Sequence, residues 1–505
     1  MGQLLPITPP AGVVANGTEY STKGRWVDSD LVRFQEGHLE PIGGWQLLSG
    51  TALTGGAVRQ MFAYRDNDFD PILAVATDDK IHTLYLSNFN EITPTGFVGA
   101  SGSGNLAYGF GAGPYGEESF GDARTVSGLK KKAINITFDS FGEDLLFCSS
   151  GDGKIYRWQP NSGSTPDAAG AVLTNAPLAN TAVAVTNERH VLALGAGGDP
   201  RKVQFSDQEA PTTWTPSATN LAGSIILQTQ GSLMAGVRYK TDMLLFTDED
   251  VHRMYYVGAP LAYGVQKVGS ACGPLSPRCI VPTGNFIAWL SENGPVVYDG
   301  FVRPLPCDVH DFIYNNLNAD AHELVCGGSN SVNSEIWWFF PTTEGDQNSK
   351  YVIYNYQEKV WSVGELERGA WIDRGAFDVP LAGDKDGFLY EHERGTLSAS
   401  SGVGTRKPFC KTGPIEVGNG DRVAYINRII PDEESNSVGC VSFAFKGRQT
   451  PLGTEYDLGT FNIDADGYTD CRFSARQVQM TVEGVTDRSW KLGQVRLEGA
   501  LRGRR

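Results

Sequence analysis

The sequence predicts an all-β protein that contains a β-propeller of about seven blades, within a range of about six to eight, an extended N-terminal arm and a C-terminal β-sandwich. Three observations point to this fold class. The 505 residues include 61 Gly, 24 Phe, 19 Tyr and 10 Trp, a composition that favours short strands and tight turns. Long helical periodicity is hard to find, and one hairpin pattern recurs along most of the chain.

The size and charge of the chain limit its function. A chain of 505 residues is long enough for two or three domains. Its formal net charge of −16 argues against a protein that grips nucleic acid tightly, because such proteins neutralise phosphates with Lys and Arg. The charge is compatible with a surface past which DNA slides without sticking.

The cysteines and the first residues carry little targeting information. The 8 Cys form no CxxC pair and no Cys/His cluster at zinc spacing, and Cys148 lies in an apolar run. We therefore expect mostly reduced, buried thiols. The start lacks the basic region and apolar core of a signal peptide, and no run of about 18 apolar residues occurs, so we expect no membrane insertion.

Residues 1–60 are expected to form an extended, Pro-containing arm followed by short strands. Bulky apolar residues such as Trp26, Phe34 and Trp45 alternate with polar and Gly positions. The turns are predicted at 36–38 and 43–44, where Gly residues occur.

The clearest hairpin pattern is LLFCSSGDGKIYRW at 145–158. An apolar run leads into a polar turn that holds Gly151 and Gly153, and a run rich in aromatic residues follows. Six further segments have the same order. They are 71–86, 190–206, 243–257, 286–300, 335–361 and 379–392.

The spacing of these hairpins predicts the propeller and its limits. Turn centres are roughly 40 to 55 residues apart, the length of a four-stranded blade, except for a first interval of about 70. The long interval contains a Gly-rich segment at 96–128 that is short of aliphatic residues, and we treat it as an insertion. The propeller is therefore expected at 61–395, followed by a Ser/Gly linker at 396–408 and a β-sandwich at 409–505.

The sequence gives no catalytic constellation. GxSxG, the Walker phosphate loop and the dinucleotide fingerprint are absent. The turn at 149–153 resembles an imperfect Asp box, and 384–387 and 464–467 resemble the start of a calcium loop without its Glu. All three are interpreted as hairpin turns in which Asp bonds its own backbone amides. We expect no enzyme activity, no cofactor and no metal.

Two groups of residues have both a structural and a functional interpretation. The aromatic run at 337–340 fits a propeller core better than a sugar-binding surface, because it lies within apolar strands. Arg502, Arg504 and Arg505 form either a solvated tail or an electrostatic contact with an acidic neighbouring subunit or with DNA.

An ordered series of motifs resembles the nozzle, or tail-tip hub, proteins of short-tailed bacteriophages. The resemblance covers most of the chain except the Gly-rich insertion. Its motifs are GRWVDSDLVRF…PIGGW (24–45), SDQEAPTTWTPSATNLAG (206–223), LLFTDEDVHRMYYVG (244–258), Cys272–Gly273, VVYDG (296–300), EIWWFFP (335–341), YVIYNYQEKVWSVG (351–364), LYEHERG (389–395) and FSARQVQMTVEG…WKLGQVRLEG (473–499). These are strand and turn motifs, which specify fold better than any reaction.

The resemblance implies a structural protein of the virion tail, made in the host cytoplasm. Such a subunit forms a ring, expected to be a hexamer, beneath the tail adaptor, around a DNA exit channel that is closed before infection. Tail fibres or a spike are further expected partners, and DNA passes without sequence-specific binding. Six subunits would carry about −96, which would keep passing DNA mobile. The alternative function is a receptor- or glycan-binding tail propeller.

The Gly-rich insertion supplies a candidate gate or contact loop. Its length and its lack of aliphatic residues suggest a segment that projects from the first blade region. The candidate residues are Phe110, Tyr115, Glu117, Glu118 and Phe120. A surface loop without function is an equally good interpretation.

Overall fold

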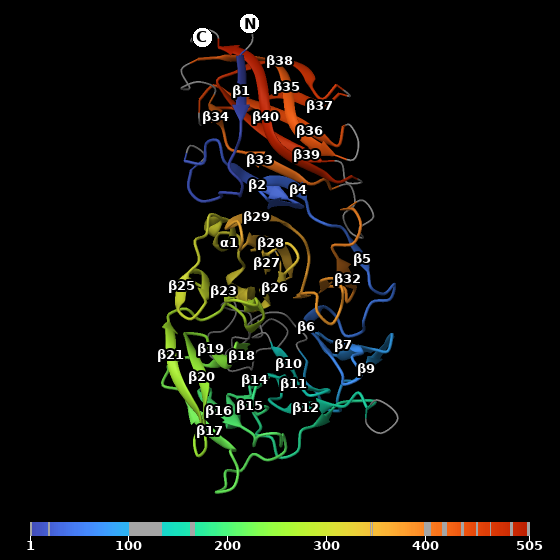
Figure 1. The fold of residues 1–505 in the computed structure, drawn as a ribbon, viewed down its shortest axis with the longest axis vertical. Coiled ribbons are helices and arrows are strands. Elements are labelled where there is room, and N and C mark those ends of the chain that lie inside the picture. Colours follow the sequence, from blue (N-terminus) through green and yellow to red (C-terminus); the bar gives the residue numbers. More distant parts are fainter. Residues whose placement is uncertain are drawn as a thin grey trace, which may run out of the picture.

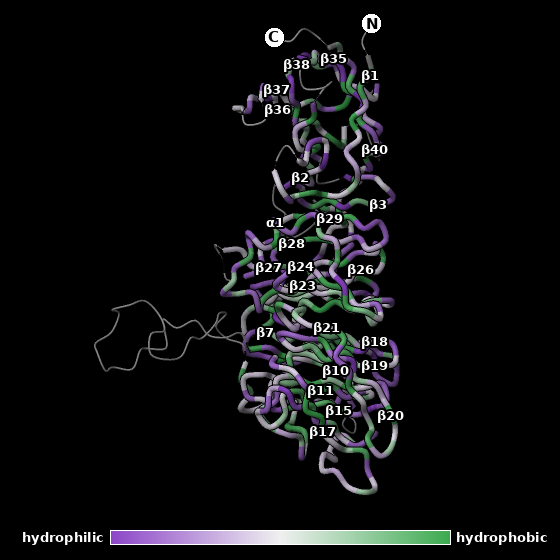
Figure 2. Tube along the Cα trace, turned by 90° about the vertical axis from the view of Figure 1, so that its left-hand side faces the viewer, coloured by the Kyte–Doolittle hydropathy of each residue, from purple (hydrophilic) through white to green (hydrophobic). Residues whose placement is uncertain are grey.

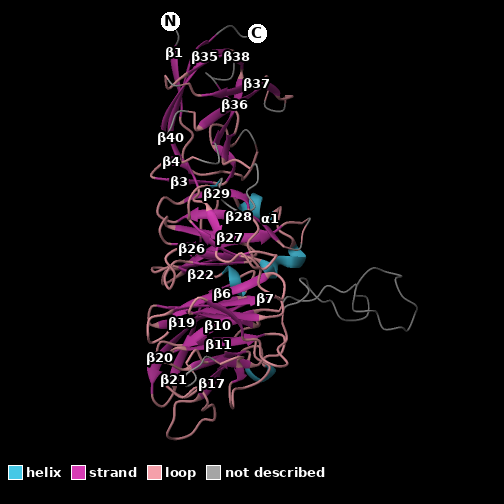
Figure 3. Cartoon of the chain, turned by 90° about the vertical axis from the view of Figure 1, so that its right-hand side faces the viewer, coloured by secondary structure: helices cyan, strands magenta, loops and turns pink. Residues whose placement is uncertain are grey.

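The computed structural model is an elongated molecule built almost entirely of β-strands (Figure 1). It describes residues 3–18, 21–99, 134–161, 167–343, 345, 347–397, 406–416, 422–435, 439–450, 453–464, 466–484 and 488–501. Figure 3 shows that helices in this part of the chain are short pieces between strands. They include α1 (His310–Tyr314), η2 (Ala196–Gly198), η3 (Pro277–Cys279) and η4 (Ala319–Leu324). The described residues contain no helix that is long and apolar enough to span a membrane.

Four-stranded antiparallel sheets succeed one another along the chain, and we number them in chain order. Sheet 1 contains β6 (Val58–Arg65), β7 (Pro71–Thr77), β8 (Ile81–Tyr85) and β9 (Asn88–Glu91). Sheet 2 contains β10 (Ile136–Phe141), β11 (Asp144–Ser149), β12 (Ile155–Trp158) and β13 (Ala171–Val172). Sheet 3 contains β14 (Ala182–Val185), β15 (Val191–Leu194), β16 (Lys202–Phe205) and β17 (Gly223–Ile226). Sheet 4 contains β18 (Leu233–Tyr239), β19 (Asp242–Thr247), β20 (Asp250–Gly258) and β21 (Ala262–Ser270).

Three further sheets complete the series. Sheet 5 contains β22 (Val281–Pro282), β23 (Ile287–Ser291), β24 (Gly294–Tyr298) and β25 (Val302–Pro304). Sheet 6 contains β26 (Cys326–Asn330), β27 (Glu335–Pro341), β28 (Asn348–Asn355) and β29 (Val360–Glu365). Sheet 7 contains β30 (Ala370–Ile372), β31 (Leu381–Gly383), β32 (Leu389–His392) and, from the start of the chain, β5 (Trp45–Leu47). Each sheet resembles a blade of a WD40-type β-propeller.

All seven predicted hairpins are confirmed. Each one forms the second and third strands of a different sheet. In sheet 2, for example, Phe147 lies opposite Tyr156 and Leu145 lies opposite Trp158. The pattern was readable because these middle strands are buried and joined by short turns, so their apolar residues stand close together in the sequence.

The seventh sheet is completed from the N-terminal segment. Trp45 and Leu47 in β5 pair with His392 and Tyr390 in β32. The first strand of sheet 7, β30, also packs against β6, the first strand of sheet 1, so the series of sheets returns to its beginning. The propeller was expected to start at residue 61 and not at β5. A three-residue strand far from its partner leaves no local pattern in the sequence.

Two six-stranded sheets form the other end of the molecule (Figure 1). The first contains β1 (Gln3–Ile7), β3 (Val32–Gln35), β4 (His38–Pro41), β35 (Ala424–Ser435), β38 (Thr469–Ala475) and β40 (Trp490–Leu501). The second contains β2 (Trp26–Asp30), β33 (Phe409–Thr412), β34 (Ile415–Glu416), β36 (Val441–Arg448), β37 (Tyr456–Asn462) and β39 (Gln477–Gly484). We call this pair of sheets the sandwich.

The segment 1–60 does not stand apart as an arm with its own strands. Strand β1 pairs with β40, β2 pairs with β33, and β4 touches β40, so four N-terminal strands belong to the sandwich. These strands bury Trp26 and Phe34 within the core that also contains the apolar residues of the C-terminal strands. Burial of these large side chains explains why the two ends of the chain come together.

The remaining sequence expectations concern turns and the core. Trp337, Trp338, Phe339 and Phe340 are at most 1% exposed, as expected for core residues, and Figure 2 shows hydrophobic residues concentrated along the strands. The turn 384–387 joins the paired strands β31 and β32, as predicted. The prediction for 464–467 was wrong, because these residues connect β37 in one sandwich sheet to β38 in the other. Most of the expected insertion and linker lies outside the described residues.

Candidate functional site

The candidate gate residues Phe110, Tyr115, Glu117, Glu118 and Phe120 lie outside the described residues, as do Arg502, Arg504 and Arg505. Their roles stay predictions.

The two flanks of the Gly-rich segment meet at the turn between β11 and β12. The amide of Val98 donates to Asp152 Oδ2 at 3.3 Å, and the Ser149 hydroxyl donates to the Val98 carbonyl. A Cβ atom placed on Gly151 would lie 2.8 Å from Ile134 Cδ1 and 2.9 Å from Val98 Cγ1. Residues 98 and 134 therefore lie beside the same turn. This is the turn that resembles an Asp box.

The Asp residues in turns of this type accept hydrogen bonds from backbone amides. Asp152 Oδ1 accepts from the amide of Lys154 at 3.0 Å, and its Oδ2 accepts from the Tyr156 hydroxyl at 2.7 Å. Asp384 repeats this arrangement, since Oδ1 accepts from the Phe388 amide at 2.8 Å and Oδ2 from the Tyr390 hydroxyl at 2.8 Å. Neither carboxylate belongs to a group of three metal-ligating side chains, and the described residues contain no such group.

Arg278 connects two sheets that are not neighbours in the series. It lies in η3, whose N-cap Ser276 accepts from the Arg278 amide at 3.1 Å. Arg278 Nη1 donates to the Arg59 carbonyl of sheet 1 at 3.2 Å, and Nη2 donates to the Glu323 carbonyl at 2.5 Å. Because η3 directly precedes sheet 5, and sheets 1 and 5 are not neighbours, this contact spans the array. Burial, with Arg59 nearby, lowers the pKa of Arg278 to about 10.

The connection that carries Arg278 requires Gly273. A Cβ atom on Gly273 would lie 1.9 Å from the Asp248 carbonyl oxygen, and the neighbouring Cys272 amide donates to the Glu249 carbonyl at 3.0 Å. The backbone at Gly273 therefore lies so close to the turn after β19 that no residue with a side chain would fit there. The Cys272–Gly273 motif marks this crossing, but no sequence pattern points to Arg278.

A cavity of about 660 Å³ lies beside sheets 6 and 7 and is lined by residues that include Trp45, Arg368 and Tyr390. The Arg368 guanidinium carbon lies 4.2 Å from the Tyr390 ring centroid and 5.3 Å from that of Trp45. The cation thus covers both aromatic faces. All ten Trp of the chain are at most 5% exposed, so no Trp offers the bare ring on which a sugar would stack.

Arg368 also sets the state of His392. Its Nε donates to His392 Nε2 at 3.0 Å, which requires an unprotonated acceptor nitrogen there. Burial, and secondarily the charge of Arg368, hold the pKa of His392 well below its usual value. The histidine is therefore neutral in the folded protein.

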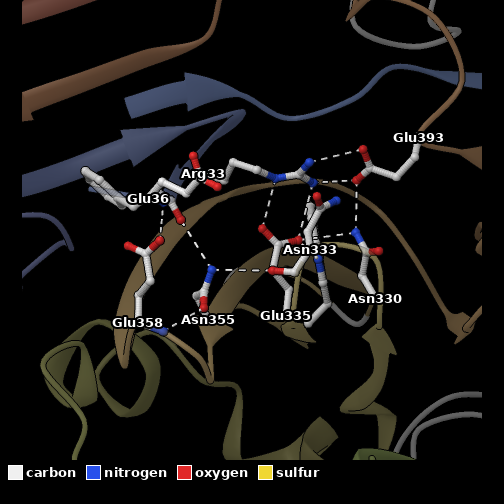
Figure 4. Close-up of polar contacts among 10 residues, drawn as sticks. Arg33, Glu36, Asn330, Asn333, Glu335, Asn355, Glu358 and Glu393 are labelled. Atoms are coloured by element: carbon white, nitrogen blue, oxygen red, sulfur yellow. Dashed lines mark hydrogen bonds and ion pairs between the residues drawn. The ribbon is translucent and has the colours of Figure 1, made fainter. Parts of the chain in front are cut away.

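The sandwich meets sheets 6 and 7 at a buried polar cluster (Figure 4). Arg33 of β3 is 5% exposed, and its Nε lies 2.9 Å from Glu335 Oε1 of β27. Arg33 Nη1 donates to Glu393 Oε2 at 3.1 Å, and Nη2 makes a second contact with the same carboxylate. Asn330 Nδ2 donates to both Glu335 Oε2, at 3.3 Å, and Glu393 Oε1, at 3.0 Å. We call Arg33, Asn330, Glu335 and Glu393 the joint cluster.

Further hydrogen bonds surround the joint cluster. The Ser29 hydroxyl donates to the Val363 carbonyl at 2.7 Å, and the Tyr351 hydroxyl accepts from the Leu31 amide at 2.9 Å. The Glu358 carboxylate accepts from the amides of Glu36 and Gly37, the latter at 3.2 Å. These bonds fix β2, β3 and the β3–β4 turn on sheet 6.

Sequence reasoning missed the joint cluster, although two signals were present. Arg33 stands between Val32 and Phe34 in an apolar strand, and Glu335 directly precedes a run of five buried apolar residues. A charge inside an apolar run requires a partner if it is buried. The identity of that partner could not be read, because Arg33 and Glu335 are 302 positions apart.

The cysteines follow the expectation of reduced, buried thiols. All eight are free, and only Cys307 is half-buried rather than buried. Burial raises the pKa of Cys272 and Cys279 to about 11 and that of Cys326 to about 12. These thiols suit packing and not catalysis.

The comparisons with known proteins concern the fold. No family model and no curated protein matches the sequence. The chain is similar to the WD40 domain of Pan2 from Neurospora crassa, with 8% identity, a TM-score of 0.39, and coverage of 71% of this chain and 98% of that one. It is also similar to the WD40 domain of Toxoplasma gondii coronin, with 10% identity, a TM-score of 0.33, and coverage of 77% of this chain and 85% of that one. For the AfRom2 CNH domain the identity is 11%, the TM-score is 0.32, and the coverage is 54% of this chain and 87% of that one. These values carry no inference about function.

Proposed function

We propose that this chain is a structural subunit of a short-tailed bacteriophage tail, which forms a ring below the tail adaptor and thereby forms and closes the DNA exit channel. Its seven sheets are the blades of one closed propeller, and the ring is a hexamer. The observation that carries the proposal is the interlocking of the two ends of the molecule. The N-terminal segment supplies β1 to β4 to the sandwich and β5 to sheet 7, so both bodies behave as one.

Such interlocking suits a part that transmits load. A boundary crossed by one flexible linker allows relative motion of two domains. Here the boundary holds the joint cluster, the bonds from Ser29 and Leu31, and a hydrophobic core that continues from the sandwich into sheets 5 and 6. A ring of such subunits would resist bending between its two layers.

The bridge at Arg278 supports a DNA path outside the propeller. The contact between η3 and sheet 1 joins two sheets that are not neighbours in the series, and Arg278 is 7% exposed there. Duplex DNA could not pass through this contact. In the proposed ring the DNA runs along the symmetry axis between subunits, next to surfaces that share the net charge of −16 per chain. A channel wall made mainly of Arg and Lys would contradict this part of the proposal.

The burial of all ten Trp favours the conduit over the alternative, a receptor- or glycan-binding tail propeller. Sugar-binding sites usually present aromatic rings to the ligand, and in the cavity of about 660 Å³ the rings of Trp45 and Tyr390 are covered by Arg368. A protein receptor would remain compatible with the fold.

Electron microscopy of the purified chain, alone and with the tail adaptor, tests the proposal. Six-fold rings with an axial hole are expected. A monomer or trimer that stays unassembled with the adaptor and binds cell-surface glycan would favour the alternative.

The candidate loop has a separate test in phage particles. Deletion of residues 99–122 removes Phe110, Tyr115, Glu117, Glu118 and Phe120 together. If these residues gate the channel or contact a neighbour, the deletion impairs assembly, DNA retention or ejection. Unchanged assembly, retention and ejection would leave the segment without a role.

A further inference from the structure

The geometry points to a proton-sensitive joint between the sandwich and the propeller sheets. The joint cluster holds the two parts together more strongly when it carries one proton than when it carries none. The joint cluster contains one guanidinium, from Arg33, and two carboxylates, from Glu335 and Glu393. With both carboxylates ionised it holds an excess negative charge. This inference is independent of the proposed function, because it concerns a single chain.

Three of the four members of the joint cluster are buried too deeply for water to compensate a charge, and the Glu393 side chain is 18% exposed. Glu335 is 0% exposed, Asn330 is 0% exposed and Arg33 is 5% exposed. An uncompensated charge in such a place is costly, and a buried carboxylate reduces the cost by taking up a proton. Two carboxylates that share one cation are the arrangement in which one of them does so.

The hydrogen bonding of the cluster is also incomplete, because Arg33 Nε and Glu335 Oε1 form no hydrogen bond in the described structure although they lie 2.9 Å apart. Glu335 and Glu393 both accept from the same Asn330 amide nitrogen, and Glu335 Oε2 additionally accepts from Trp337 Nε1 at 3.0 Å. Asn330 Oδ1 is buried and has no hydrogen-bond partner in the described structure. A proton on either carboxyl group would convert one acceptor oxygen of the cluster into a donor.

The neighbouring cation, Lys491, forms its ion pair with Glu40, outside the joint cluster. Glu40 of β4 lies near Arg33, and burial raises its pKa against the influence of Arg33. Lys491 of β40 lies 3.8 Å from Glu40, at the outer side of the cluster. The other charged groups here, Glu36 and Glu358, are acidic and meet through a backbone amide.

The pKa of Glu335 determines the pH range over which the stability of the joint changes. Burial raises its pKa to about 7 from an ordinary value of 4.5, Arg33 opposes this shift, and Glu393 adds to it. A carboxyl group whose pKa is raised by folding stabilises the joint fully below about pH 4.5, and this contribution is lost as the pH rises to about 7. Above about pH 7 the contribution is constant.

Hydrogen exchange of the β3 and β27 amides, corrected for intrinsic rates, tests the inference. Relative to E335Q, wild type should show an opening constant of the joint that rises up to about tenfold per pH unit between about pH 5 and 7 and then levels. E358Q, which removes a carboxylate at the same boundary but outside the joint cluster, should keep the wild-type dependence. The inference would be overturned if the opening constants of wild type and E335Q had the same pH dependence.

An infrared titration of wild type covers the case in which E335Q does not fold. A protonated carboxyl band should disappear between about pH 6 and 8 in the folded protein, far above the range of exposed Glu. Absence of such a band would overturn the inference as well. Neither readout depends on ring formation, so failure of the proposed function would leave both intact.

Discussion

Arg33 and Glu335 stand 302 positions apart in the sequence, and their Nε and Oε1 atoms lie 2.9 Å from each other in a buried boundary. One residue belongs to a sandwich strand and the other begins a strand of sheet 6. The pair therefore acts together with the bonds from Ser29 and Leu31 to hold the sandwich on sheet 6. Its removal is the most direct test of that coupling.

Replacement of Arg33 by Met should lower the free energy of unfolding by about 3–5 kcal/mol, because it leaves buried Glu335 and half-buried Glu393 without a cation. Urea unfolding followed by Trp fluorescence measures the effect. Arg189→Met is the matched control, since its partner Glu209 is exposed and the change should be within about 1 kcal/mol. Equal effects for the two variants would mean that the joint cluster does not hold the boundary.

Trp45→Ala should cost about 3–5 kcal/mol, because Trp45 is 1% exposed and anchors the strand that completes sheet 7. Leu47→Ala lies on the same strand but is 40% exposed, so it should cost well under half as much. Thermal unfolding of both variants measures the difference. Similar losses would indicate that the strand contributes its backbone pairing alone.

Gly273→Ala should destabilise the protein by about 1–3 kcal/mol or more, because the new methyl group would meet the Asp248 carbonyl oxygen, a backbone atom that cannot turn away. Gly284→Ala is the control, since no atom lies within 4 Å of its Cβ position. Urea midpoints of the two variants should separate clearly. A G273A midpoint equal to that of G284A would contradict the close approach.

Neutral, buried His392 should make the protein less stable in acid. Its folded pKa is lowered below the unfolded value, so its contribution is present above about pH 6.5 and is lost as the pH falls, by up to about 1.4 kcal/mol per pH unit. His392→Gln keeps a side-chain acceptor for Arg368 and should lack this part of the pH dependence. His38→Gln, at an exposed position, should behave like wild type. The comparison requires unfolding free energies between about pH 5 and 7.

The sequence predicts what is local and leaves out what is distant. The hairpin 145–158 could be read because Phe147 and Tyr156 pair across a short turn. Strand β5 could not, because Trp45 meets His392 only after most of the chain has intervened. The joint cluster was missed for the same reason, and the turn 464–467 was misread because nothing in it reveals that its flanking strands belong to different sheets. The candidate gate residues and the terminal Arg residues lie outside the described residues.

The pairing of β1 with β40 has a consequence for synthesis. The ribosome produces Gln3–Ile7 long before the partner strand, Trp490–Leu501. At about 5–20 residues per second, the first strand waits roughly 25–100 s for its partner. During that time the N-terminal strands of the nascent chain expose unpaired edges, so a chain stalled before β40 should be prone to aggregation and degradation. Translation of β40 is thus the step that permits β1 to pair.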